Sequence, residues 1–307
     1  MNLSEDETKL YDRQLRLFGI ESQQKIRNAR VVIVGKLNST MQEVLKNLVL
    51  VGVGSFLFYK VTEIEDEHLT LFGASLESTL EHMRTLNHSV KVEKVLHMDD
   101  IDYKIMLAFG LEKNEVINLN NLCRQRDAQF VACDVKGTYA AILIDGLNHQ
   151  FVTEYKRKSE SNKDVEVDVI ETRKEIYEHV KKIFNLKPLG AEILKKLKRS
   201  TNLFSPLVPL FIGNEILSTK SAYWNDSDNL VLSTSSECLK IGLPGDFVPK
   251  ELAEHFQSSE GLDIPFVGAL VGGLLSQEVI KLISERDPPA NYGIFINSME
   301  PSAFILQ

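Results

Sequence analysis

The feature that most constrains the fold is a run of four apolar residues, Val31–Val34, which ends at Gly35 and precedes a helical pattern. A run that is apolar at every position is typical of a strand buried on both faces of a sheet. In residues 41–51 the apolar side chains recur at helical spacing. Gly52 predicts the end of that helix, because glycine accepts a left-handed backbone. This part of the chain therefore predicts a strand–loop–helix unit of an α/β protein.

The alternation of strand and helix patterns continues beyond this unit. Helical patterns cover 75–86 and 114–126, and strand patterns cover 56–59, 90–95, 105–109, 130–133, 139–144 and 151–152. This rhythm predicts a mostly parallel sheet with helices on both faces. The strands after residue 139 are candidates for an antiparallel arrangement.

Composition divides the 307 residues into three parts. Residues 156–200 contain 13 Lys and Arg against 8 Asp and Glu, whereas the whole chain has a net charge of −8. We predict that 1–155 form the first part of the α/β fold and that 260–307 close it with a helix and two strands. Between them, 156–259 form a charged, mainly helical insert with a flexible connection near 156–170 and helices at 172–198 and 203–224. The basic run 195–199 is predicted to be a solvated face, with a nuclear-import or docking patch as the alternative.

Composition also excludes several classes of protein. The acidic balance argues against general nucleic-acid binding, and no stretch of 18 apolar residues predicts a membrane span. The acidic N-terminus does not resemble a secretory signal. The three cysteines contain no Cys-x-x-Cys pair, and the seven histidines show no ligand spacing, so no metal site is predicted.

The loop after the first strand has only part of a phosphate-binding pattern. It reads Gly35-Lys36-Leu37-Asn38-Ser39-Thr40 and keeps one glycine, so side chains crowd the backbone that would approach a phosphate. Lys36 offers a cation, while Ser39 and Thr40 are predicted to cap the helix. Lys60 occupies the place at the end of the second strand where a carboxylate usually accepts hydrogen bonds from a ribose. We therefore expect the nucleotide site of this chain to be degenerate, with no cofactor bound by the chain alone.

Two stretches near the ends of the chain resemble the activating enzymes of ubiquitin-like proteins. The first is Tyr-Asp-Arg-Gln-Leu-Arg-Leu-Phe-Gly at 11–19, followed by the strand ending at Gly35. The second is the helix 271–281 with Arg-Asp-Pro-Pro at 286–289. Weaker agreement is found at 46–48, 52–53, 86–87 and 134–137, and about 156–260 matches poorly. The resemblance implies a Rossmann-like adenylation fold of the ThiF/MoeB-like type.

Within this family, the chain is most similar to the smaller, non-catalytic subunits of SUMO-activating enzymes. Such a subunit pairs with a larger catalytic subunit, which holds ATP and Mg, forms an acyl-adenylate on the SUMO-type modifier and passes it to a cysteine. The resemblance thus implies a regulatory and scaffolding partner that is not catalytic alone and meets the modifier only indirectly. It also implies the nucleus as the location, with the cytoplasm as a second one.

Arg13 is the candidate functional residue that the resemblance implies. The arginine of the Tyr-Asp-Arg-Gln motif reaches across the dimer to the triphosphate held by the partner, where a guanidinium can bind phosphate oxygens. Arg16 lies on the same helical face and is a weaker candidate. The alternative for Arg13 is an ordinary ion pair with Asp12 or Glu21.

Other readings of the sequence stay open. The chain could instead be the regulatory subunit of a neddylation-type enzyme, a stand-alone homodimeric adenylating enzyme, a nucleotide-binding oxidoreductase, or an interaction module without a role in catalysis. Cys133 is predicted to be a buried filler instead of a thioester cysteine. Asp134 and Asp145 are predicted to serve loop structure or helix capping instead of Mg binding. The small residues at 268–273 predict close packing of a helix on the sheet, or a subunit interface.

Overall fold

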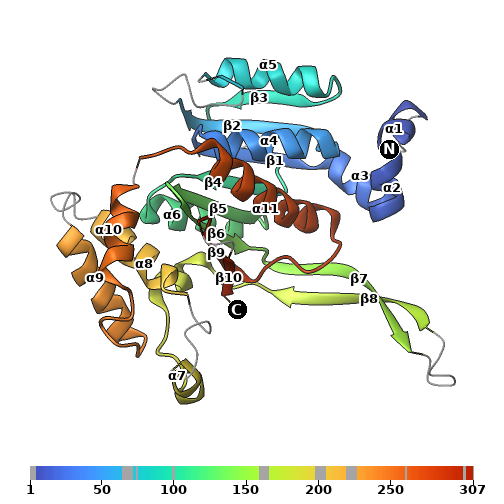
Figure 1. Ribbon diagram of the computed structural model, residues 1–307. Helices are drawn as coiled ribbons and strands as arrows, with labels where there is room; N and C mark the ends of the chain where they lie inside the picture. Colours follow the sequence, from blue (N-terminus) through green and yellow to red (C-terminus); the bar gives the residue numbers. More distant parts are fainter. Residues whose placement is uncertain are drawn as a thin grey trace.

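The computed structural model describes residues 5–63, 72–73, 75–98, 101–158, 166–197, 205–218, 227–259, 261–299 and 302–306. Its centre is an eight-stranded sheet with the order β10-β9-β6-β5-β4-β1-β2-β3 (Figure 1). Five neighbouring strands are parallel: β1 (Arg30–Lys36), β2 (Ser55–Thr62), β3 (Lys91–Val95), β4 (Ile105–Phe109) and β5 (Gln129–Lys136). Three strands continue the sheet in antiparallel pairing: β6 (Tyr139–Asp145), β9 (Tyr292–Asn297) and β10 (Ser302–Leu306). The predicted α/β fold is confirmed.

Helices cover both faces of the sheet, because successive residues of the central strands point to opposite sides. Val31 and Ile33 pack in one hydrophobic cluster, and Val32 and Val34 pack in the other. The first cluster contains α3 (Ile20–Asn28), α4 (Ser39–Val51), α5 (Leu76–Leu86) and α11 (Pro265–Ser284). The second contains α6 (Lys113–Gln125), the 3₁₀ helix Val180–Asn185, α8 (Leu207–Ser218), α9 (Ser227–Lys240) and α10 (Lys250–Ser258).

Helix α11 is long and apolar enough, by length and composition, to cross a membrane. More than half of it is buried here, because it packs against α4 and α3. A Cβ on Gly268 would lie 2.1 Å from the Ser39 hydroxyl, and one on Gly272 would lie 2.7 Å from the Glu43 Cβ. The predicted close packing is therefore present, but its partner is helix α4 and not the sheet.

A long hairpin replaces part of the predicted insert. Strands β7 (Asn148–Lys158) and β8 (Glu166–Ile176) pair in antiparallel register and project from the body of the molecule (Figure 1). The helix predicted from 172 is therefore wrong, because 172–176 belong to β8. Of the flexible connection predicted near 156–170, residues 156–158 and 166–170 lie in these paired strands, and 159–165 lie outside the described residues. A two-stranded ribbon leaves most side chains near water, so its charged composition did not exclude strands.

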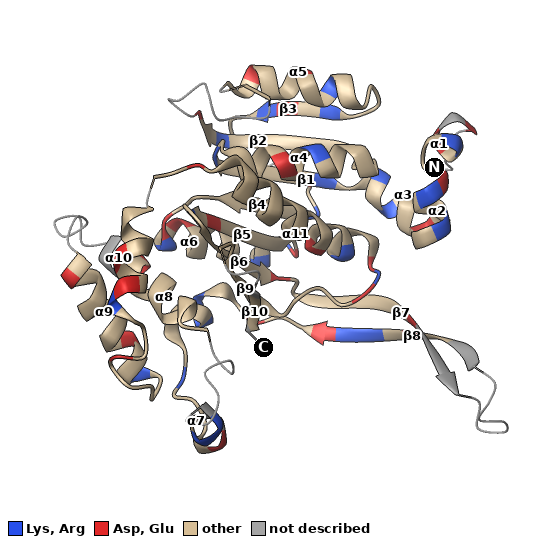
Figure 2. Ribbon diagram, viewed as in Figure 1, with Lys and Arg blue, Asp and Glu red and all other residues tan. Residues whose placement is uncertain are grey.

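The helices that follow the hairpin share their core with the sheet. Phe211 of α8 contacts Phe295 of β9 with ring centroids 6.0 Å apart, and Phe256 of α10 at 5.0 Å. Helix α7 (Ala191–Leu197) and α8 lie in the regions predicted to be helical, whereas 198–204 and 219–226 lie outside the described residues. Charged side chains are frequent on the peripheral helices and the hairpin, whereas the central strands carry few (Figure 2).

Candidate functional site

The sheet has a topological switch point at β1, which lies between β2 and β4. In open α/β sheets ligands bind at such a point, outside the carboxyl ends of the strands. A cleft of about 280 Å³ lies there, next to the loop that the sequence singled out. Its lining residues are Lys36, Leu37, Asn38, Glu63, Gly110, Asp134, Val135, Lys136, Gly261, Leu262 and Asp263.

The glycine of this loop serves the packing of the sheet. Gly35 has φ +106°, and a Cβ at this position would lie 2.0 Å from the carbonyl oxygen of Phe109 in β4. Leu37 is fully buried in the hydrophobic cluster beneath α4. Glycine is thus required here by the neighbouring strand, without reference to a ligand.

Asn38 caps helix α4. Its side-chain oxygen accepts a hydrogen bond from the backbone N–H of Met41 at 2.8 Å. The prediction that Ser39 and Thr40 cap the helix is therefore wrong, because the helix already begins at Ser39. Asparagine is among the preferred N-cap residues, so the sequence contained this alternative.

The first backbone donor of α4 is bound by a carboxylate of the chain itself. The N–H of Ser39 donates to Oδ2 of Asp263 at 2.8 Å, and the Ser39 hydroxyl donates to Oδ1. Asp263 lies in the segment between α10 and α11, more than two hundred residues further along the chain. Donors that a phosphate would use at this helix end are therefore already engaged, so the residues as they stand do not fit a phosphate group.

Two lysines give the cleft positive charge. Lys36 follows Gly35 and forms no ion pair with any residue that the structure describes. Lys136 at the end of β5 lies 3.5 Å from the carboxylate of Asp134. Asp134 lies within β5 and lines the cleft, so the predicted role in loop structure or helix capping is wrong for this residue, and Lys136 is its ion-pair partner.

Lys60 is not at the end of the second strand. It has φ +47° at a bulge, where the pairing of β1 with β2 shifts register, and β2 continues to Thr62. The lysine Nζ lies 5.2 Å from the centre of the Tyr59 ring. The carboxylate that follows the strand is Glu63, which lines the cleft and accepts a hydrogen bond from the N–H of Leu76 at 3.0 Å. The register shift hid Glu63 from the sequence analysis.

Tyr11 anchors the helix that carries Arg13. It lies between α1 (Glu5–Leu10) and α2 (Asp12–Phe18), and its ring packs on Gly52, where a Cβ would lie 2.7 Å from it. Its hydroxyl accepts a hydrogen bond from Asn87 at 3.0 Å, and burial raises its pKa. Gly52 ends α4, so Tyr11 fixes α2 at the opposite end of α4 from the cleft.

Arg13 and Arg16 differ in their contacts. The guanidinium of Arg16 pairs with Asp12 at 3.0 Å. Arg13 is exposed and forms no ion pair or hydrogen bond with the described residues, so the alternative pair with Asp12 or Glu21 is not formed there. Helix α4 has 13 residues and is therefore about 20 Å long. Arg13 thus lies at the far end of this helix from the cleft of its own chain.

All three cysteines are buried and free. Burial raises the pKa of Cys123 to about 12 and that of Cys238 to about 11, and it also raises the pKa of Cys133. A thioester cysteine must be accessible and ionisable, so Cys133 is a filler as predicted. Within the described residues no group of three His, Cys, Asp or Glu side chains could hold a metal ion.

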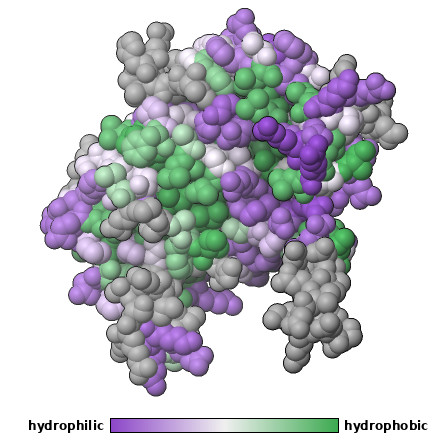
Figure 3. All heavy atoms as spheres, turned by 45° about the vertical axis from the view of Figure 1, so that its right-hand side comes forward, coloured by the Kyte–Doolittle hydropathy of each residue, from purple (hydrophilic) through white to green (hydrophobic). Residues whose placement is uncertain are grey.

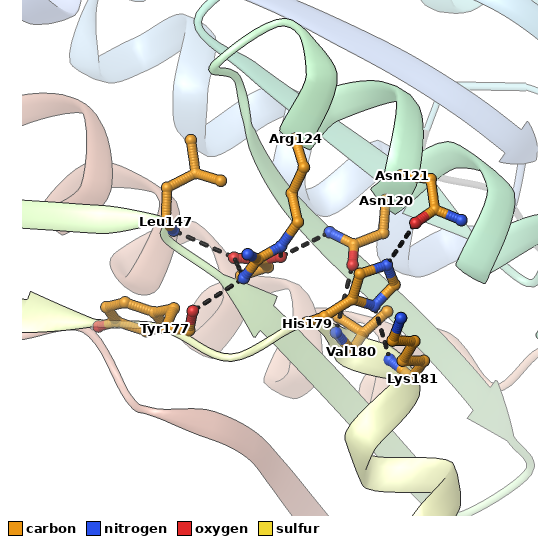
Figure 4. A network of polar contacts seen from close by, with 9 residues as sticks. Asn120, Asn121, Arg124, Leu147, Tyr177, His179, Val180 and Lys181 are labelled. Carbon is orange, nitrogen blue, oxygen red and sulfur yellow. Dashed lines mark hydrogen bonds and ion pairs between the residues drawn. The ribbon is translucent and has the colours of Figure 1, made fainter.

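Asp145 pairs with Phe130 near the start of β5, so it lies at the opposite end of the strands from the cleft. Its buried carboxylate accepts hydrogen bonds from Arg124 at 2.5 and 2.9 Å, and from Asn120 at 2.8 Å. Arg124 also donates to the carbonyl oxygen of Tyr177, and the N–H of Leu147 donates to Asp145 (Figure 4). Asp145 thus holds both ends of the hairpin and serves loop structure, as predicted.

A second pocket, which shares Asp134 with the cleft, is lined by a half-buried acid that the sequence analysis missed. Glu215 of α8 accepts a hydrogen bond from the N–H of Lys113, the first residue of α6, at 2.9 Å. Burial, with the nearby Asp134, raises its pKa to about 7. Nothing in its local sequence distinguishes Glu215 from a surface acid, because the burial comes from distant strands.

Comparisons with known proteins agree with this geometry. No protein-family model matches the chain. SUMO-activating enzyme subunit 1 of Rattus norvegicus is 27% identical over 340 residues, which cover 99% of this chain and 95% of the relative. The Homo sapiens subunit is 26% identical over 337 residues, which cover 99% of this chain and 95% of the human protein. DNA damage tolerance protein RHC31 of Saccharomyces cerevisiae is 25% identical, and the match covers 94% of this chain and 93% of the yeast protein.

Solved structures show the fold. Escherichia coli MccB with ATP superposes with a TM-score of 0.53 at 14% identity, covering 99% of this chain and 73% of that chain. MccB alone superposes with a TM-score of 0.51 at 15% identity, and the match covers 98% of this chain and 70% of MccB. The chain therefore has the ThiF/MoeB-like α/β fold and resembles subunit 1 of SUMO-activating enzymes along almost its whole length.

Proposed function

We propose that this chain is the non-catalytic subunit of a heterodimeric SUMO-activating enzyme. It scaffolds a larger catalytic subunit, in which ATP and Mg are held, and contributes Arg13 to the triphosphate there. Its own nucleotide site is degenerate, so the chain alone binds no cofactor. Similarity to SUMO-activating enzyme subunit 1 over 99% of the chain supports this choice of modifier.

The observation that carries the proposal is the separation of Arg13 from its own cleft. Tyr11 holds α2 against Gly52, about 20 Å along α4 from Ser39. An arginine side chain is too short to cover that distance, so Arg13 cannot serve a phosphate in its own cleft. An exposed, unpaired guanidinium can instead act on a neighbouring subunit, which makes adenylation depend on assembly.

An apolar surface offers a place for the partner. On α11, Phe266 is 58% exposed and Leu270 is 44% exposed, and a Cβ on Gly273 would have no neighbour within 4 Å. Exposed apolar residues also occur on α2, α3 and α4, of which α3 and α4 pack against α11: Leu17, Ile20 and Leu50. Apolar side chains reach the surface in patches (Figure 3). We assign this surface, here called the α11 face, to the larger subunit.

The first test is purification from the native source, with identification of associated chains by mass spectrometry. The proposal expects a larger partner together with this chain and no tight ATP binding by this chain alone. A homodimer with Mg-dependent ATP binding would replace it with the stand-alone adenylating enzyme.

The second test is directed at Arg13. In the reconstituted pair, Arg13→Ala is expected to slow adenylate formation at least tenfold, measured as ATP–pyrophosphate exchange, because a positioned guanidinium stabilises charge on phosphate. Arg16→Ala is the matched control and is expected to stay near the wild-type rate, since Arg16 is paired with Asp12. Equal rates for wild type and Arg13→Ala would remove Arg13 from the site.

We further propose that the chain acts in the nucleus, with a second pool in the cytoplasm. Lys195 and Lys196 are exposed on α7 and could bind an import receptor. Imaging of a double Lys195→Glu, Lys196→Glu variant tests this role, and an unchanged nuclear fraction would argue against it.

A further inference from the structure

Helix α2, which carries Arg13, has little packing of its own to orient it. It has seven residues, which is too short for a stable isolated helix, and none of its side chains that the structure describes is buried. Gln14 and Leu15 are half-buried, and its other described side chains are exposed. The direction in which Arg13 points therefore depends on what holds the two ends of this helix.

Gly19 forms one of these ends, opposite Tyr11. Its backbone has φ 81° and ψ 165°, a conformation that is essentially restricted to glycine, and it turns the chain from α2 into α3. The N–H of Gly19 donates to the carbonyl oxygen of Leu15 at 3.0 Å, and the Gly19 carbonyl oxygen accepts the N–H of Gln23 at 3.2 Å. This turn thus joins the exposed α2 to α3, whose Ile26 is fully buried.

Arg286 lies against this turn, although it comes from the other end of the chain. A Cβ on Gly19 would lie 3.7 Å from Nη1 of Arg286, and Nη2 of the same guanidinium pairs with Glu154 of β7 at 2.6 Å. Gly19 ends the stretch that begins with Tyr-Asp-Arg-Gln, and Arg286 begins the Arg-Asp-Pro-Pro stretch. The two stretches that were singled out in the sequence therefore meet here, with the guanidinium between the α2–α3 turn and the hairpin.

Backbone contacts hold Arg286 itself in place, because it forms a parallel bridge with Val152 of β7. The N–H of Val152 donates to the carbonyl oxygen of Glu285 at 2.9 Å, and the N–H of Asp287 donates to that of Val152 at 3.1 Å. The Glu285 carboxylate also pairs with Lys25 of α3 at 2.8 Å. The segment after α11 is therefore bound to the hairpin and to α3, and it can keep a side chain fixed over the turn.

We propose that Arg286 is a positioning residue for Arg13. Its guanidinium holds the end of α2 at Gly19, as Tyr11 holds the beginning, so Arg13 is presented to the larger subunit in a fixed direction. This role rests on the proposed function, because Arg13 must act on the partner's triphosphate. It also gives the hairpin a task, since the pair with Glu154 keeps Arg286 over the turn. Misplacing a catalytic group by about 1 Å can lower a rate about a hundredfold, so a contact remote from the chemistry affects it.

Hydrogen exchange of the full-length chain tests the structural half of this role. In Arg286→Ala the backbone amides of α2 are expected to exchange at least tenfold faster, because one of its two anchors is lost, whereas the buried α4 keeps its protection. Arg173→Ala is the matched control on the hairpin, where Arg173 pairs with Glu171 at 2.8 Å. It is expected to leave α2 as protected as in wild type. Unchanged protection of α2 in Arg286→Ala would overturn the positioning role.

ATP–pyrophosphate exchange by the reconstituted pair, at saturating larger subunit, tests the functional half. Arg286→Ala is expected to slow adenylate formation at least fivefold, and Arg173→Ala to stay within twofold of wild type. Combining Arg286→Ala with Arg13→Ala is expected to cost no more than Arg13→Ala alone, because Arg286 acts only through Arg13. A merely structural role would instead multiply the two losses. Multiplied losses, or a wild-type rate for Arg286→Ala, would overturn the inference.

The same measurements separate this inference from the proposed function. A wild-type rate of ATP–pyrophosphate exchange in Arg13→Ala would remove the role of Arg13 and the positioning role with it. A slow rate in Arg13→Ala without any effect of Arg286→Ala would remove the positioning role alone. If Arg286→Ala does not fold, Arg286→Lys takes its place in both experiments, because it keeps a cation for Glu154 and removes the guanidinium over Gly19.

Discussion

At the residue scale, His149 is a buried titratable group far from the cleft. It is 3% exposed, its ring stacks on Phe151, and its Nδ1 lies 3.2 Å from the amide of Gln129. Burial lowers its pKa to about 4, and Lys104 and Lys25 act in the same direction while Glu285 opposes them. The folded protein therefore contains a neutral imidazole where the unfolded chain binds a proton more readily.

This depressed pKa makes stability depend on pH. Between pH 6.5 and 4 the unfolded state binds more protons at this position than the folded state, so stability falls as the pH falls through that range. The shift corresponds to a loss of about 3 kcal/mol in the free energy of unfolding. Urea unfolding of wild type and His149→Phe across this range should show the steeper decline in wild type. The same decline in both proteins would assign the pH dependence to other groups.

The residues of the cleft differ in how far the neighbouring sequence reveals their role. Lys36 and the single Gly35 could be recognised from the sequence, because both adjoin the strand that ends there. Asp263 could not, because the contact with Ser39 joins segments 224 residues apart in the chain. The sequence analysis recognised Tyr11 only as part of the Tyr-Asp-Arg-Gln motif. Its role as an anchor could not be predicted, because it depends on the contact of the Tyr11 ring with Gly52.

At the element scale, the contact between α4 and α11 fixes the geometry of the cleft. Gly268 and Gly272 face α4, whereas Gly273 faces outward. Alanine at Gly268 would place its Cβ 2.1 Å from the Ser39 hydroxyl, so a helix must shift. Alanine at Gly273 would meet no atom within 4 Å and would favour the helix.

The two alanine variants should therefore change the free energy of unfolding in opposite directions. Gly268→Ala is expected to lower the free energy of unfolding by about 1–3 kcal/mol, because overpacking costs that much. Gly273→Ala is its matched control on the same helix and is expected to raise it by about 0.5–1 kcal/mol in the isolated chain. Urea denaturation measures both. A neutral Gly268→Ala would show that the two helices are free to separate at this point.

The elements themselves were predictable where their patterns were strong. The runs at 31–34 and 105–109 are buried on both faces, and the helix that ends at Gly52 carries its own stop signal. Only 151–152 of the hairpin were predicted as a strand, because burial of alternate side chains is limited to the start of β7, at His149 and Phe151, and most of the remaining hairpin sequence is polar or charged. Its ends are held by the distant Arg124–Asp145 pair, which local sequence does not reveal.

At the scale of the whole molecule, the functional groups are distributed over two ends of one helix. Ser39 and Asp263 meet at the start of α4, and Tyr11 with Arg13 lies at its end. Helix α11 packs against α4 and α3, and α3 contacts α2, the helix that carries Arg13, so a subunit that covered α11 and α3 would also meet Arg13. The same interface could thus hold the two subunits together and place the Arg13 guanidinium at the partner's triphosphate.

This arrangement predicts which surface substitutions separate the subunits. Leu270→Glu puts a charge on the α11 face and is expected to weaken association with the larger subunit at least a hundredfold, because desolvating an unpaired carboxylate is costly. Leu232→Glu is the matched control: Leu232 is 68% exposed on α9, which packs on the other face of the sheet. Calorimetric titration of each folded variant with the partner measures the loss. If Leu232→Glu abolished binding and Leu270→Glu did not, the partner would have to lie on the α9 side, and Arg13 could not reach its triphosphate from there.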